Sequence, residues 1–102
     1  MKMQEMAVIF DALSKTVRLK VFCILLKHHE KGTGGVTPTQ IAKEMGNIPR
    51  NTLSFHLSLL GSAGLCHSRR RGKTILYVPD CKHIKAVAAF LVKDCCKGEC
   101  KW

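Results

Sequence analysis

Three cysteines stand close together at the end of this 102-residue chain, as Cys95, Cys96 and Cys100. Three thiolates suit a soft ion that takes three sulfurs in a pyramid, such as trivalent arsenic or antimony, whereas zinc usually takes four ligands. The number and spacing of these residues therefore predict a metalloid site made of three sulfurs.

This site requires the chain to change direction between the second and third cysteine. Adjacent residues of a helix point about 100° apart, so Cys95 and Cys96 converge on one ion only where the helix ends. Gly98 is predicted to provide that end by taking a left-handed conformation, which lets Cys100 fold back. The pattern leaves open a redox pair, a tail without fixed structure, and a third sulfur from Cys81 or from another subunit.

Two further cysteines, Cys23 and Cys66, lie among apolar residues and are predicted to be buried packing groups. The N-terminus lacks the apolar run and cleavage site of a signal peptide, and no stretch approaches the roughly 18 apolar residues of a membrane helix. We therefore expect a cytoplasmic protein without a membrane partner. In a reducing compartment, metal binding or redox sensing by the cysteines is favoured over a disulfide framework.

The charge of the chain indicates a polyanionic partner. Seventeen Lys and Arg residues against seven Asp and Glu residues give a formal charge of +10, and no acidic residue lies between Glu44 and Asp80. That acid-free window concentrates positive potential, as expected for nucleic-acid binding. No nucleophile stands with a histidine and an acid at a recognisable spacing, so we expect no enzyme and no catalytic cofactor.

The first 63 residues predict four helices. Apolar residues recur at helical spacing through residues 1–30, and Ser14 is placed to cap the second of two helices there. After a glycine-rich break, Thr37 is a predicted N-cap, with Pro38 at the first helical position and Gln40 as capping-box partner. Residues 37–63 form two short helices, ending near Met45 and Ser62, across a tight turn, which predicts a helix-turn-helix.

The remaining residues predict a hairpin and one more helix. Apolar residues alternate over 65–79, which indicates a β-hairpin with a basic tip at residues 69–73. A last helix is expected over 80–96, with Asp80 as its cap, followed by a sensor tail over 97–102. The broad apolar arc of this last helix predicts contact with a partner subunit. The chain is thus expected to be a single domain over 1–102, mainly helical with a β-hairpin wing: a winged helix-turn-helix with an additional C-terminal dimerisation helix.

Side chains of the second helix of this motif and of the wing are the predicted DNA contacts. Those on the helix would reach base edges or phosphates, and those on the wing would neutralise the phosphate backbone. An aromatic side chain at position 55 could instead cover the core. The predicted contact residues are Arg50, Asn51, Thr52, Ser54, Phe55, His56, Arg69, Arg70, Arg71 and Lys73.

Residues 52–65, Thr-Leu-Ser-Phe-His-Leu-Ser-Leu-Leu-Gly-Ser-Ala-Gly-Leu, carry an S-x-HL-x-x-L-x-x-AGL pattern and are followed by Arg70-Arg71-Gly72-Lys73 and Tyr77. These residues resemble the ArsR/SmtB family of metal-responsive repressors. The resemblance implies a homodimer, paired through its first and last helices, that places one recognition helix of each subunit in the major groove of double-stranded operator DNA.

The family's ligand sites differ between members. One arsenic-sensing pattern, C-x-C-x-x-C in the first helix of the motif, has no counterpart here, because residues 37–45 contain no cysteine. A zinc-type site on the last helix is matched only in part, by Asp80 and His83. Some arsenic-responsive members end that helix in a cysteine pair with a third cysteine shortly after, and Cys95, Cys96 and Cys100 resemble this arrangement.

The resemblance thus implies a repressor whose inducer is As(III) or Sb(III). Cadmium, zinc or an oxidant acting on the same thiols is the alternative within this class. A thiol-redox or metal-sequestering protein that does not bind DNA is the alternative outside it.

Overall fold

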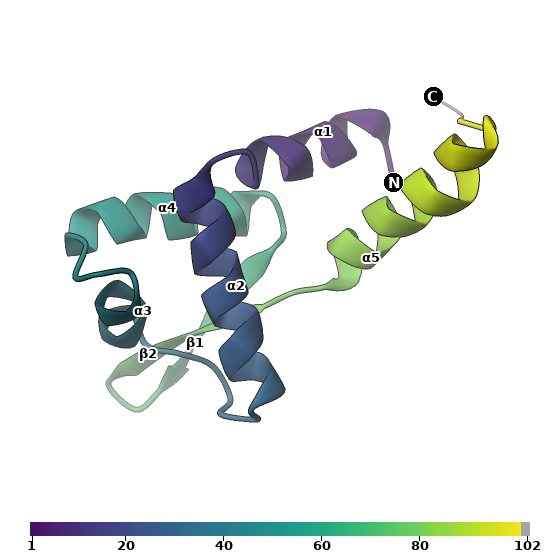
Figure 1. Ribbon diagram of the computed structural model, residues 1–102. Helices are drawn as coiled ribbons and strands as arrows, with labels where there is room; N and C mark the ends of the chain where they lie inside the picture. Colours follow the sequence, from purple (N-terminus) through teal and green to yellow (C-terminus); the bar gives the residue numbers. More distant parts are fainter. Residues whose placement is uncertain (101–102) are drawn as a thin grey trace.

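The computed structural model describes residues 1–100, and its mainly helical architecture with one β-hairpin confirms the predicted winged helix-turn-helix fold (Figure 1). Two N-terminal helices precede the two helices of the motif, then the hairpin, then the last helix. The elements are α1 (Met3–Ala12), α2 (Thr16–Glu30), α3 (Pro38–Glu44), α4 (Arg50–Ser62), β1 (Cys66–Arg71), β2 (Thr74–Pro79) and α5 (Lys82–Ala89).

The core lies where α2 packs against the other elements. Leu53, Leu57 and Leu60 are spaced so that they share one face of α4, and all three are buried. They meet Val21 and Leu25 of α2, both fully buried. Each helix therefore buries one apolar stripe, which leaves its other face to solvent or partners.

Local chemistry sets the helix-turn-helix. The Thr37 side chain accepts a hydrogen bond from the Gln40 amide at 3.1 Å, and Pro38 occupies the first turn of α3, as predicted. The Gln40 side chain, however, donates to Glu44 at 2.8 Å. The turn after α3 holds Asn47 at a φ of 62°, a left-handed conformation that Asn tolerates better than most residues.

The wing differs in one respect from its prediction. The register runs from Cys66 opposite Pro79 to Arg71 opposite Thr74, so only Gly72 and Lys73 form the turn. The arginines at 69–71 lie on strand β1 and not at the tip. The two-residue connection explains this, because such a turn needs a positive φ, which Gly72 supplies at 63°.

Two other local predictions are wrong. Lys15, not Ser14, is the N-cap of α2, and the Ser14 hydroxyl instead donates to the Asp11 carbonyl at 2.7 Å. Cys66 is buried as expected, but Cys23 is exposed. Val21, Phe22 and Leu25 form the buried face of α2, and Cys23 points away from it.

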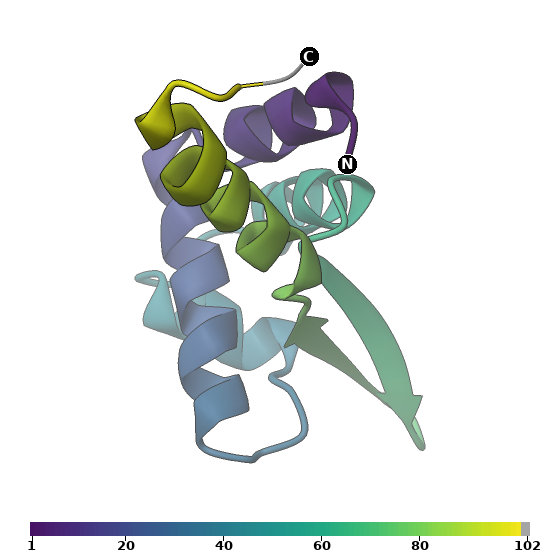
Figure 2. The same cartoon turned by 90° about the vertical axis from the view of Figure 1, so that its right-hand side faces the viewer.

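The last helix is irregular at its C-terminal end. The α-helix α5 stops at Ala89, a π-helical turn covers Phe90–Asp94, and a 3-10 turn covers Cys95–Lys97. Asp80 accepts from the Lys82 amide at 2.9 Å, although Cys81 is the N-cap residue. Figure 2 shows the last helix in front of α1, with which α5 is in contact, and Figure 1 shows its C-terminal end running past the N-terminus of α1. Within residues 1–100, no helix has the length and apolar character needed to cross a bilayer.

Candidate DNA-binding surface and thiol site

The outer face of the first half of α4 is polar except for one aromatic ring. Asn51, Thr52 and Ser54 are exposed, and Phe55 is 61% exposed, so this ring does not cover the core. The Arg50 guanidinium donates to the Thr39 hydroxyl at 2.8 Å, which links the start of α4 to α3. These side chains offer hydrogen-bond donors, acceptors and one apolar contact to the same side of the helix.

His56, which is among the predicted DNA contacts, is less accessible than the other predicted contacts on α4. Its ring is half-buried, and its Nδ1 lies 3.5 Å from Arg18 Nη1. Burial, and then the positive charge of Arg18, lower the pKa of His56. The lowered pKa favours the neutral imidazole, and only part of the ring is open to a ligand.

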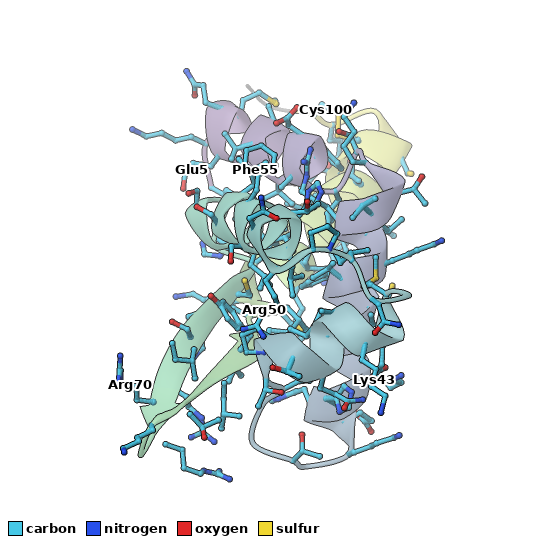
Figure 3. The ribbon with its side chains drawn as sticks, turned by 90° about the vertical axis from the view of Figure 1, so that its left-hand side faces the viewer. Glu5, Lys43, Arg50, Phe55, Arg70 and Cys100 are labelled. Atoms are coloured by element: carbon cyan, nitrogen blue, oxygen red, sulfur yellow. A yellow bond between two sulfur atoms is a disulfide. The ribbon has the colours of Figure 1, made fainter. Side chains whose placement is uncertain are left out.

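The wing presents four exposed basic side chains, and one of them already has a protein partner. Arg69 donates from Nε and Nη2 to the Gly34 carbonyl, at 3.0 and 2.6 Å. Arg70 projects from the wing away from the helices (Figure 3). Arg71 and Lys73 are also exposed. The wing arginines thus differ, because Arg69 also holds the loop that precedes α3.

Helix and wing meet around a small hollow of about 300 Å³. Arg50 contributes to it from α4 and Lys73 from the wing, so two positive charges flank it. Hydroxyl groups lie beside them. The lining residues are Thr37, Pro38, Thr39, Arg50, Lys73, Thr74 and Ile75. This composition suits a phosphate oxygen, because hydroxyls and cationic groups donate to it.

The tail brings together two of the three predicted sulfur ligands. Cys95 and Cys100 form a disulfide, with their Cα atoms 4.6 Å apart. The fold-back occurs at Gly98, whose φ is 74° and whose amide donates to the Cys95 carbonyl at 2.9 Å. Cys96 is a free, exposed thiol in the same turn, and Cys81 lies at the start of α5. Among residues 1–100, no three His, Cys, Asp or Glu side chains are grouped as a metal site.

A polar cluster between α2 and α3 was missed from the sequence. Glu44 accepts hydrogen bonds from Lys27, from His28 at 2.6 Å and from Gln40 at 2.8 Å. These donors, Lys27 first, lower the pKa of Glu44 to about 2. Only the Gln40 contact, at i and i+4 of one helix, was open to sequence reasoning. The cluster fixes α3 against α2 and so orients the helix-turn-helix.

Comparison with known proteins agrees with this geometry. Residues 9–69 match the sequence model of a helix-turn-helix domain family. The structure is similar to that of an ArsR-like transcriptional regulator from Rhodococcus sp. RHA1, with a TM-score of 0.73, 24% identity, and coverage of 88% of this chain and 78% of that one. A comparison with curated protein sequences finds no match.

Two other solved structures share this fold at slightly higher identity. The transcriptional repressor BigR from Xylella fastidiosa has a TM-score of 0.65 and 28% identity, with 87% of this chain and 86% of that chain covered. The homodimeric winged helix-turn-helix domain of Mb0332 from Mycobacterium bovis, a possible ArsR-family regulator, has a TM-score of 0.67 and 25% identity, with 88% and 78% covered.

The motif, the wing and the basic surface that joins them define a winged-helix DNA-binding protein. The chain belongs to the helix-turn-helix domain family. Its similarity to ArsR-like regulators supports a transcriptional regulator of the ArsR/SmtB type.

Proposed function

We propose that the protein is a homodimeric repressor that binds operator DNA and releases it when trivalent arsenic or antimony binds Cys95, Cys96 and Cys100. The observation that carries this proposal is the fold-back at Gly98, which puts the Cys95 and Cys100 sulfurs within bonding distance. Cys96, a free thiol, is the next residue after Cys95. Sulfurs that can reach each other can also reach one small ion. A thiophilic metalloid with three-coordinate geometry fits this donor set.

The proposed DNA contacts follow from exposure and position. Asn51, Thr52 and Ser54 of α4 would read base edges in the major groove, and Phe55 would contact thymine methyl groups. Arg50 and Lys73 flank the hollow between helix and wing and would hold a phosphate there, and Arg70 and Arg71 would neutralise phosphates further along the wing. His56 and Arg69 contribute with the part of each side chain that internal contacts leave free.

The proposed dimer uses α1 and the C-terminal helical segment. Val8 and Phe10 of α1 are 50% and 48% exposed, and Val92 is 64% exposed. Apolar side chains of this size favour burial against a second copy, because each buried CH₂ group contributes about 0.8 kcal/mol. The homodimeric state of the Mycobacterium bovis domain supports the same assembly here. Two recognition helices would then meet half-sites about one helical turn of DNA apart.

Metalloid binding and the disulfide exclude each other, since both use the Cys95 and Cys100 sulfurs. The disulfide is the oxidised form of the site, and reduction to two thiols would open it to the ion. This pairing also favours a second candidate function, release of DNA on oxidation of the same two thiols. Reducing conditions separate the two functions, because an oxidant-driven switch stays off there.

The decisive experiment measures operator release by arsenite and by antimonite in the presence of a reductant. Single Cys→Ser changes at 95, 96 and 100 should abolish release while operator affinity in the absence of metalloid stays near that of the wild type. Cys23→Ser is the matched control, because Cys23 is also a free, exposed thiol but lies on α2. Full release from the Cys95→Ser and Cys96→Ser proteins would refute the site.

The same assay tests where the third sulfur comes from. If Cys100→Ser still releases DNA and the further change Cys81→Ser abolishes release, Cys81 is the third ligand. For release to occur at all, the metalloid must bind the free protein more tightly than the DNA complex, with a coupling of about 1–3 kcal/mol. Equal metalloid affinity of free and DNA-bound protein would overturn the mechanism.

A further inference from the structure

Arg18 is a charged side chain inside the core. It lies near the start of α2 and is only 6% exposed. Because arginine is almost never buried without partners, its contacts explain its position. Its Nε donates to the Ala12 carbonyl at 2.8 Å, and its Nη2 lies 3.5 Å from the Asp11 carbonyl. These carbonyls belong to the last turn of α1, where helix carbonyls lack partners within the helix. Arg18 therefore caps α1 from the neighbouring helix.

The third contact of Arg18 crosses to the recognition helix. Nη1 lies 3.5 Å from Nδ1 of His56, which is 38 residues away in sequence. A guanidinium has only donors, so Nδ1 of His56 must be the acceptor in this contact. A neutral imidazole carries one hydrogen, which must then be on Nε2. Because the two ring nitrogens lie on different edges of the ring, Nε2 faces away from the guanidinium.

We propose that Arg18 is a positioning residue that holds His56 in its Nε2–H tautomer, so that the ring offers the operator a hydrogen-bond donor. The inference rests on the proposed binding of α4 to DNA. An Nε2–H donor selects acceptors: a phosphate oxygen, a purine N7, guanine O6 or thymine O4. It cannot accept from the amino groups of adenine or cytosine. Arg18 would thus set what His56 recognises without touching DNA.

The lowered pKa of the ring agrees with this assignment. Burial and the charge of Arg18 both lower the pKa of His56. Protonation would put a second N–H on Nδ1, directed at a guanidinium that can only donate. The contact itself therefore opposes the charged form as well as the other neutral tautomer.

The direct test is long-range ¹H–¹⁵N NMR of the histidine rings in the free wild-type protein at neutral pH. The pattern of nitrogen shifts distinguishes Nε2–H, Nδ1–H and imidazolium, and the signals that vanish in His56→Gln identify His56 among the five histidines. We expect the Nε2–H pattern. An Nδ1–H or imidazolium pattern would overturn the proposal, and this measurement depends neither on DNA binding nor on a variant of Arg18.

Operator affinity provides the second test. The amide nitrogen of Gln can replace Nε2–H, whereas Ala replaces nothing, so His56→Gln should keep most of the affinity. His56→Ala should lose about tenfold in a dimer, because each subunit loses a hydrogen bond whose loss costs roughly threefold. Equal losses in both variants would refute the donor role. A wild-type protein that binds no operator would refute the proposed function while leaving the NMR result intact.

Arg18→Met separates positioning from simple stabilisation. If the variant folds, it should give a mixture of the two neutral tautomers and a loss of operator affinity. The same change in the His56→Gln background should cost little further affinity, because Gln does not depend on a tautomer. Equal losses in both backgrounds, or an unchanged tautomer, would show that Arg18 acts only on stability. If Arg18→Met does not fold, the wild-type NMR pattern and the Gln and Ala pair decide the proposal.

Discussion

The two neighbouring arginines of the wing should respond differently to neutralisation, and Arg70→Gln is the informative change. Arg70 is exposed and projects from β1, so we expect it to neutralise one phosphate in each subunit. Each phosphate contact contributes about 0.9 to the slope of log affinity against log salt, so a dimer of the variant should have a slope about 1.8 smaller in magnitude. A fourfold rise in salt should then weaken the variant about 12-fold less than the wild type.

Arg69→Gln is the matched control on the same strand. Its guanidinium is engaged by the Gly34 carbonyl through two donors, so its loss should change the slope by less than half as much. Fluorescence anisotropy with labelled operator at four or more salt concentrations gives both slopes. An unchanged slope for Arg70→Gln, or equal changes for the two variants, would refute this division of the wing.

Three further predictions concern stability and assembly. The pKa of Glu44, about 2, lies below its ordinary value of 4.5. Ionised Glu44 should therefore stabilise the fold above about pH 4.5, and this stabilisation should be lost as the pH falls towards 2. In acid titrations of unfolding, the loss of stability over this range should be about 1–2 kcal/mol smaller in Glu44→Gln than in the wild type. Leu60→Ala should lower the free energy of unfolding by about 2–5 kcal/mol in urea titrations, because Leu60 is fully buried. Val92→Lys should shift sedimentation towards monomer, and an unchanged dimer would place the interface elsewhere.

Local patterns were enough to predict most of the fold. The cap at Thr37 and Pro38 fixed the start of α3, because a side-chain acceptor and a residue without an amide both act within one turn. The apolar spacing of α4 predicted its buried face correctly. The end of strand β1 was harder to predict. Five of its six residues are exposed, so the arginines at its end show no alternation of apolar and polar residues that would mark them as part of a strand.

The prediction of the DNA-binding surface missed the internal contacts of its side chains, because these contacts join residues far apart in the sequence. Arg69 contacts Gly34, 35 residues away, and Arg18 contacts His56, 38 residues away. The periodicity of a sequence does not predict which donor contacts which acceptor at such separations, because these contacts form only when the elements pack together. The fold-back at Gly98 was accessible from sequence because glycine permits a left-handed residue within a short segment.

The proposed release of DNA by an ion in the tail would require a physical connection to α4, and contacts within one subunit offer a candidate for it. Phe90, Lys93 and Asp94 line a hollow of about 450 Å³ together with Met6 of α1, so the segment before the cysteines faces that helix across the hollow. The other end of α1 carries the carbonyls that Arg18 holds, and Arg18 also contacts His56. A shift of α1 would therefore move residues both at the proposed dimer interface and next to the recognition helix. Tight metalloid binding alone would not produce release, because only a difference in affinity between two arrangements of these elements shifts their populations.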